Sequence, residues 1–111
     1  MPLRDDEYFA IKSLLSGQGS WGASVVAVID AMCSVEREDT GVGFLSTVAL
    51  PPDTLASAPI SSANKTFTIN ATGQLVSFDL FVRAADRLDL EGVVFTGEWP
   101  NPFEPGDLSE G

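Results

Sequence analysis

The sequence contains no histidine, and this absence removes more chemistry than any other feature of its composition. Histidine is the side chain that most often serves as a general base at neutral pH and as a metal ligand. Without it, the chain cannot form a Ser-His or Cys-His dyad. We therefore predict that the protein is not an enzyme and that it uses no cofactor.

Cysteine is almost as scarce, because Cys33 is the only one. A single thiol cannot form an internal disulfide, which agrees with a reducing compartment. The thiol could act as a nucleophile, but no base is adjacent to it, and Met32 and Val35 lie close by in the sequence. We expect a buried structural thiol rather than a reactive one.

Patterns that bind metals and nucleotides are missing as well. The Asp-x-Asp-x-Asp-Gly loop of calcium sites does not occur, so we expect no metal site. The nearest glycine-rich segment, Gly41-Val42-Gly43, lacks the third glycine and the following helix that would hold a pyrophosphate. Nucleotide binding therefore has no support in the sequence.

Basic residues are few, with six against sixteen acidic ones and a formal net charge of −10. A negative field of this size disfavours the phosphate backbone, so we predict no nucleic-acid partner. The same field would attract a basic protein. Solubility alone is the simpler explanation of such a charge, so the charge by itself does not establish a partner.

Long apolar runs are also absent. The longest stretch with few charges, around residues 45–64, contains Pro51, Pro52, Asp53 and Pro59, which excludes a membrane span. Acidic residues 5–7 stand where a secretory signal would need a basic start and an apolar run. We expect a soluble, cytoplasmic protein with no membrane partner, folded as a single domain over residues 1–111.

Hydrophobic spacing predicts an α+β fold, with two N-terminal helices packed on a four- or five-stranded antiparallel sheet. Apolar residues three and four apart predict a first helix over about 5–16, capped by Asp5 or Asp6. Ser20 is expected to cap a second helix that carries Met32 on its apolar face. The predicted core consists of Trp21, Ile29, Phe44, Val48, Phe78, Leu80, Leu88 and Leu90.

Alternating apolar residues predict the strands. They cover 34–50, with a bulge near 41–43, then 66–69 after a loop that reaches residue 63. A hairpin over 78–95 carries apolar residues on both faces, which predicts a central place in the sheet. The proline-rich tail predicts an irregular arm over about 100–111, with order ending near residue 104.

Two pairs of carboxylates stand two residues apart in predicted strands: Glu36 with Glu38, and Asp89 with Glu91. Side chains at this spacing share one face of a strand. Such a pair could do acid and base work, but glycoside hydrolysis needs two carboxylates on opposing walls of a cleft, one of them desolvated. A solvated strand face is the favoured interpretation.

Two segments resemble an uncharacterised family of small bacterial proteins. Residues 37–44 fit the pattern R-E-x-T-G-x-G-F, and residues 90–100 resemble L-E-G-Y-T-Y followed by a closing W-P. Val93 and Phe95 replace the usual aromatic pair, which weakens a role for a tyrosine hydroxyl there. The resemblance implies no activity. Some proteins of this look accompany polymorphic toxin systems as immunity proteins, which implies a basic toxin as partner.

The leading hypothesis is a non-catalytic protein-binding module, monomeric or homodimeric, of which an immunity-type protein that neutralises a basic toxin is one form. Acidic residues around an aromatic anchor are typical of a binding hot spot. The residues predicted to contact the partner are Asp79, Asp89, Glu91, Glu98 and Trp99. For Trp99, a role as a core plug is favoured over partner contact.

The second hypothesis is a small-molecule-binding domain or a minor enzyme. It would use the carboxylate pair Asp89 and Glu91 in a pocket under the loop over 51–63.

Overall fold

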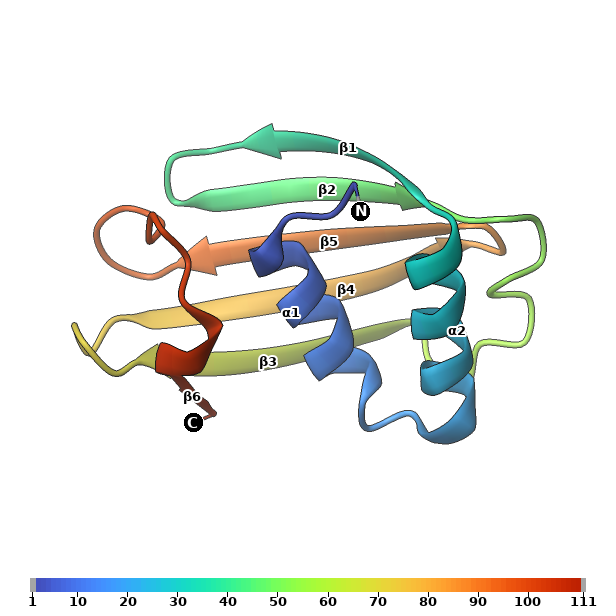
Figure 1. Ribbon diagram of the computed structural model, residues 1–111, viewed down its shortest axis with the longest axis horizontal. Helices are drawn as coiled ribbons and strands as arrows, with labels where there is room; N and C mark the ends of the chain where they lie inside the picture. The colour runs from blue at the N-terminus through green and yellow to red at the C-terminus, as the bar shows by residue number, and fades with distance from the viewer. Residues whose placement is uncertain (1, 111) are drawn as a thin grey trace.

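Both helices lie against one face of a six-stranded antiparallel sheet in the computed structural model, which describes residues 2–110 (Figure 1). The α+β prediction is confirmed, with six strands in place of four or five. Neither described helix is long and apolar enough to cross a membrane. The elements in chain order are α1 (Asp5–Leu15), α2 (Gly19–Ala31), β1 (Ser34–Asp39), β2 (Gly43–Ala49), β3 (Ser62–Ile69), β4 (Leu75–Ala84), β5 (Arg87–Val94), the short 3-10 helix η1 (Pro105–Asp107) and β6 (Leu108–Glu110).

The strands are ordered β1-β2-β5-β4-β3-β6, so the hairpin of β4 and β5 lies in the middle of the sheet, as predicted. The predicted bulge near 41–43 is wrong. Gly41 has a φ of +85° and lies in the turn between β1 and β2, where glycine meets no steric penalty. The irregularity in pairing lies instead between Val82 and Ala84 of β4.

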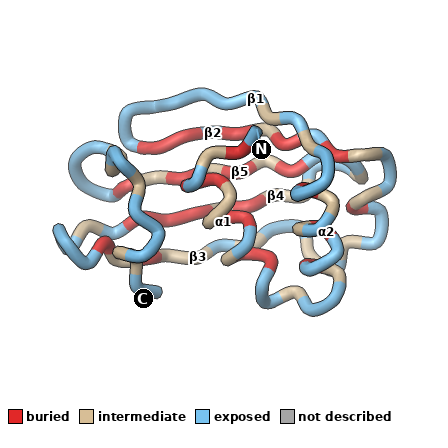
Figure 2. Tube along the Cα trace, in the orientation of Figure 1, coloured by how far each residue is buried: buried red, intermediate tan, exposed pale blue. Residues whose placement is uncertain are grey.

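The core lies between the helices and the sheet, where the buried stretches of the central strands run beneath α1 (Figure 2). All the predicted core residues except Trp21 are buried, and Trp21 is partly buried. Phe78 has no exposed surface, and its ring meets the rings of Phe44, Phe67 and Trp99 at centroid distances of 6.4, 6.0 and 5.8 Å. The contacts with Phe67 and Trp99 are edge-to-face, a geometry that adds to the stabilisation that burial alone gives.

The helix ends differ from the prediction. Arg4, not Asp5 or Asp6, is the N-cap of α1, and its backbone N–H donates to Glu7 Oε1 at 2.7 Å. Asp5 and Asp6 occupy the first turn, where negative charge interacts favourably with the helix dipole. Ser20 likewise lies inside α2, which starts at Gly19.

The predicted apolar role of Met32 is also wrong. Met32 is 67% exposed because α2 ends at Ala31 and the backbone of Met32 is already extended, with φ −162° and ψ 117°.

The tail from residue 100 onward is more regular than predicted. Strand β6 pairs with the end of β3, with Leu108 opposite Ile69, and Asn70 N–H donates to the Asp107 carbonyl at 2.8 Å. Phe103 stacks on Trp99 with centroids 6.0 Å apart, which returns the chain to the sheet. The expected end of order near 104 is therefore wrong, while Gly111, the last residue of that arm, lies outside the described residues.

Strand β3 is longer than predicted, because it begins at Ser62 inside the expected loop.

Candidate functional site

The sheet face that points away from the helices carries a cluster of acidic and apolar side chains. In β2, Phe44, Ser46 and Val48 are buried, so the alternate residues Leu45 and Thr47 lie on the opposite face. In the strands paired with β2, the same alternation places the residues opposite Leu45 and Thr47 on this face too. Arg87, opposite Ala49, lies on this surface as well. We use the name open face for the acidic and apolar part of it, which comprises Glu36, Glu38, Leu45, Thr47, Asp79, Phe81, Asp89 and Glu91.

The strand register arranges the open face in two rows across the sheet. One row runs Glu38, Leu45, Glu91, Asp79, and the other runs Glu36, Thr47, Asp89, Phe81. Directly paired residues on adjacent strands lie about 5 Å apart, so the side chains of each row are neighbours. Members of both rows line a shallow depression of about 690 Å³.

Asp89 is the carboxylate on the open face that binds cations within the chain. Arg83 Nε donates to Asp89 Oδ2 at 2.9 Å, and Arg87 Nε donates to Asp89 Oδ1 at 3.1 Å. Partial burial acts to raise the pKa of the Asp89 carboxyl, but the hydrogen bonds from Arg87 and Arg83 outweigh it, and the pKa lies below its ordinary value. Asp89 is therefore ionised at pH 7, and the two arginines balance its negative charge.

The remaining acids of the open face are not neutralised in this way. Within residues 2–110, Glu36, Glu38 and Glu91 form no ion pair. Asp79 accepts a hydrogen bond from the neutral Asn64 side chain at 2.8 Å. The rows thus present Glu38 and Glu91 as carboxylates with no ion-pair partner in the described chain, while Glu36 lies within electrostatic reach of Arg87.

Apolar side chains lie among these acids. Leu45 is 44% exposed and stands between Glu38 and Glu91 in its row. Phe81 is partly exposed, with the Arg83 guanidinium carbon 4.6 Å from its ring centroid. An apolar centre surrounded by charged groups is the usual arrangement of a protein contact surface.

The predicted site residues divide between two places. Asp79, Asp89 and Glu91 lie together on the open face, whereas Trp99 lies on the helix side with its Nε1 donating to Asp6 Oδ2 at 3.0 Å. Trp99 also packs edge-to-face on Phe44 at 5.5 Å, which agrees with its favoured role as a core plug. Glu98 is exposed in the segment after β5.

The predicted pocket under the loop over 51–63 is misplaced. No residue of that loop lines the depression that holds Asp89 and Glu91. Both carboxylates belong to the open face because β5 alternates, with Leu88 and Leu90 buried toward the helices.

Sequence reasoning did not assign Glu36, Glu38, Leu45 or Phe81 to the site. The signal that could have found Leu45 is its parity: it alternates with Phe44 and therefore lies opposite the core.

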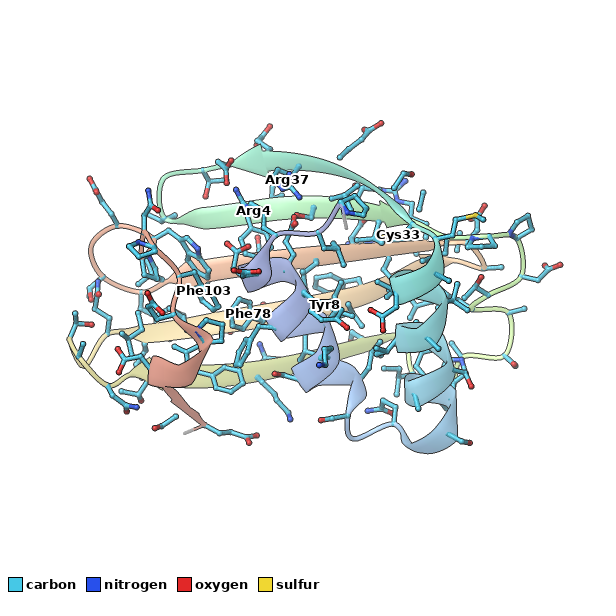
Figure 3. The ribbon with its side chains drawn as sticks, viewed as in Figure 1. Arg4, Tyr8, Cys33, Arg37, Phe78 and Phe103 are labelled. Atoms are coloured by element: carbon cyan, nitrogen blue, oxygen red, sulfur yellow. The ribbon has the colours of Figure 1, made fainter. Side chains whose placement is uncertain are left out.

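A second polar cluster lies under α1 and is buried. Glu7 has no exposed surface, accepts hydrogen bonds from Arg37 Nε at 2.9 Å and from the Ser46 hydroxyl, and so joins α1 to β1 and β2. Burial acts to raise the pKa of the Glu7 carboxyl, but the hydrogen bonds from Arg37, Ser46 and the Arg4 backbone lower it below its ordinary value. Figure 3 shows Arg37 and Arg4 on the side of α1 that faces β1 and β2. This cluster holds the fold together rather than forming a site.

Cys33 is partly buried, not fully buried as expected. Burial raises the pKa of its thiol above the ordinary value, and the nearby Glu7 and Asp30 raise it further. A thiol in this state is a weak nucleophile at neutral pH. Among residues 2–110, no three acidic or thiol side chains converge as metal ligands.

Comparisons with protein-family models, with curated proteins and with solved structures find no match. The resemblance of residues 37–44 and 90–100 to a family of small bacterial proteins therefore stays a prediction. The open face provides the basis for assigning a function.

Proposed function

We propose that this protein is a non-catalytic binding module that engages a basic protein through its open face. The observation that carries the proposal is the arrangement of Glu38, Leu45 and Glu91 in one row, with an exposed apolar side chain between two carboxylates that have no cation in the described chain. Lysine or arginine side chains of a partner would supply the missing cations, and an apolar side chain would cover Leu45.

The net charge of −10 supports the same partner chemistry, because it attracts a basic surface at long range and repels an acidic one. Acidic rows on the open face also oppose pairing with a second copy of that face. An immunity-type protein that neutralises a basic toxin is a role of this kind. We place the interaction in the cytoplasm, since a lone free cysteine fits a reducing compartment.

The alternative function, a carboxylate pair working on a small molecule, is less well supported. A general acid needs a carboxyl whose pKa is raised toward neutrality. The pKa of Asp89 is lowered instead, and the carboxylate is held by Arg83 and Arg87. Asp89 therefore lacks the proton that acid catalysis requires.

The test uses wild-type protein as bait in an extract of the source organism, followed by affinity measurements on the purified partner. The open-face variant carries Glu38→Gln and Glu91→Gln, and the matched control carries Asp53→Asn and Glu104→Gln, two exposed acids outside the open face. Both variants lose two negative charges.

We expect the open-face variant to bind the partner about tenfold more weakly, because exposed charge pairs contribute up to about 1 kcal/mol each. The control should keep wild-type affinity, and added salt should weaken wild-type binding. Equal loss in both variants, or an affinity that does not change with salt, would refute the proposal.

A further inference from the structure

Strand β1 is an edge of the sheet, with β2 on one side and no other strand of the described chain on the other (Figure 1). Thr40 N–H donates to the Gly43 carbonyl at 3.0 Å, which makes these opposite residues a hydrogen-bonded pair. Pairs alternate along an antiparallel ladder, so Glu38 and Glu36 bond to β2 while Val35, Arg37 and Asp39 turn their backbone groups outward. Within residues 2–110 these outward groups have no backbone partner.

The charges on β1 oppose pairing with a second copy of the same edge. In an antiparallel pair centred on Arg37, Glu36 of one copy would stand opposite Glu38 of the other. A slip of two residues, the smallest that keeps the outward backbone groups paired, would place Glu36 opposite Glu36 or Glu38 opposite Glu38. Like charges directly opposite each other destabilise a sheet. Pairing of β1 with β1 of a second copy is thus disfavoured, whereas pairing with a positively charged strand is favoured.

We propose that the partner adds an extended basic segment to β1 as a seventh strand. Lysine or arginine at every second position of that segment would lie opposite Glu36 and Glu38 and would extend the two rows of the open face. The backbone groups of Val35, Arg37 and Asp39 would form the ladder. This inference rests on the proposed function and names the element through which the partner binds.

Side chains already fix the conformation that such a strand would meet. Arg37 is held on the helix side by Glu7 at 2.9 Å, and Asp39 accepts from Arg4 Nη1 at 2.8 Å. The edge is therefore ordered before binding, and Glu36 and Glu38 are left as the carboxylates of β1 that form no ion pair within residues 2–110.

A synthetic peptide tests the proposal without the natural partner. The probe is acetyl-Thr-Lys-Val-Lys-Val-Lys-Thr-amide, and two control peptides replace lysine by glutamate or carry N-methyl groups on the backbone amides. The N-methylated peptide keeps every lysine charge but cannot donate to a ladder. Binding is followed by NMR on the labelled protein, with amide hydrogen exchange at Val35, Arg37 and Asp39.

We expect exchange at these three amides to slow about tenfold when the free peptide is at ten times its dissociation constant. The glutamate and N-methylated peptides should bind at least tenfold more weakly. The variant Glu36→Gln with Glu38→Gln should lose affinity, and the matched variant Asp53→Asn with Glu104→Gln, two exposed acids outside the open face, should retain it.

No binding of the lysine peptide, or no protection at the three amides, would overturn edge addition. If the N-methylated peptide binds as well as its parent, edge addition is overturned while charge-driven contact through the open face stands. The proposed function is refuted by a different result: the purified protein partner binds the open-face variant with wild-type affinity.

Discussion

Replacing Arg37 with leucine removes the cation that neutralises the most deeply buried carboxylate of the protein. Glu7 has no exposed surface, whereas the Arg37 side chain is 26% exposed. The variant leaves Glu7 with the Ser46 hydroxyl and the Arg4 backbone N–H but with no charged partner among the hydrogen bonds it accepts in wild type. The penalty therefore falls on the buried anion.

Breaking a buried pair by removing one partner costs about 3–5 kcal/mol, and we take about 3 because water reaches the Arg37 side. With a urea dependence of about 1.5 kcal/mol per molar for a domain of this size, the unfolding midpoint should fall by roughly 2 M at pH 7. The fluorescence of Trp21 and Trp99 reports the transition.

The pH dependence gives the sign of the effect. In wild type the folded pKa of Glu7 lies below its ordinary value of 4.5, so the stability from the pair is present above that pH and is lost as pH falls through the folded pKa. In the leucine variant the effect of burial is no longer offset by Arg37, and the folded pKa of Glu7 rises. The stability gap between the two proteins should then narrow as pH falls from 7 to 4.5.

A second substitution sharpens the test. Adding Glu7→Gln to Arg37→Leu removes the buried charge, so the double variant should be more stable than Arg37→Leu alone at pH 7. A midpoint shift below about 0.5 M for Arg37→Leu, on the same urea dependence, would refute the reasoning, as would a gap that widens in acid.

Three further outcomes are expected. Gly92→Ala should cost about 1–3 kcal/mol of unfolding free energy, because a Cβ there would lie 2.5 Å from Phe44 Cε2, while the control Gly106→Ala meets nothing within 4 Å; equal midpoints in urea would contradict this. Trp99→Phe should cost about 1–3 kcal/mol through loss of the hydrogen bond to Asp6, measured by the same titration followed by circular dichroism; an unchanged midpoint would show that this bond contributes nothing. Cys33 should react with iodoacetamide at pH 7.5 more slowly in the folded protein than in urea, by mass spectrometry, since its pKa is raised; equal rates would count against that burial effect.

Local patterns predicted the elements in which apolar residues recur at regular spacing. The three- and four-residue spacing around Ile11 and Leu15 gave α1, and the alternation through Phe78 and Leu80 gave the central hairpin. Because each of these elements buries one face, the spacing of its apolar residues reveals the type of element.

Features that depend on distant contacts could not be predicted. Strand β6 exists because residues 108–110 pair with β3, and the tail sequence contains no strand signal of its own. Trp99 reaches Asp6 across most of the chain, which no local pattern indicates.

The candidate site was predicted only in part, because strand alternation covers some of its residues and not others. Asp79, Asp89 and Glu91 lie in regular strands, where parity decides the face, and the structure brings them together. Trp99 follows the end of β5, where alternation stops, and the chain carries it to the helix side. Charge and aromatic character alone could not show that the acids lie on the open face and Trp99 on the helix side.

The most direct measurement is methyl cross-saturation by NMR on the complex of this protein with its purified partner. Leu45 on the open face and Met32 at the end of α2 are both exposed, at 44% and 67%, and so form a matched pair of methyl probes. Saturation of the partner should attenuate the Leu45 methyl signals and leave the Met32 methyl signal unchanged. Attenuation of Met32 with Leu45 unaffected would contradict binding through the open face.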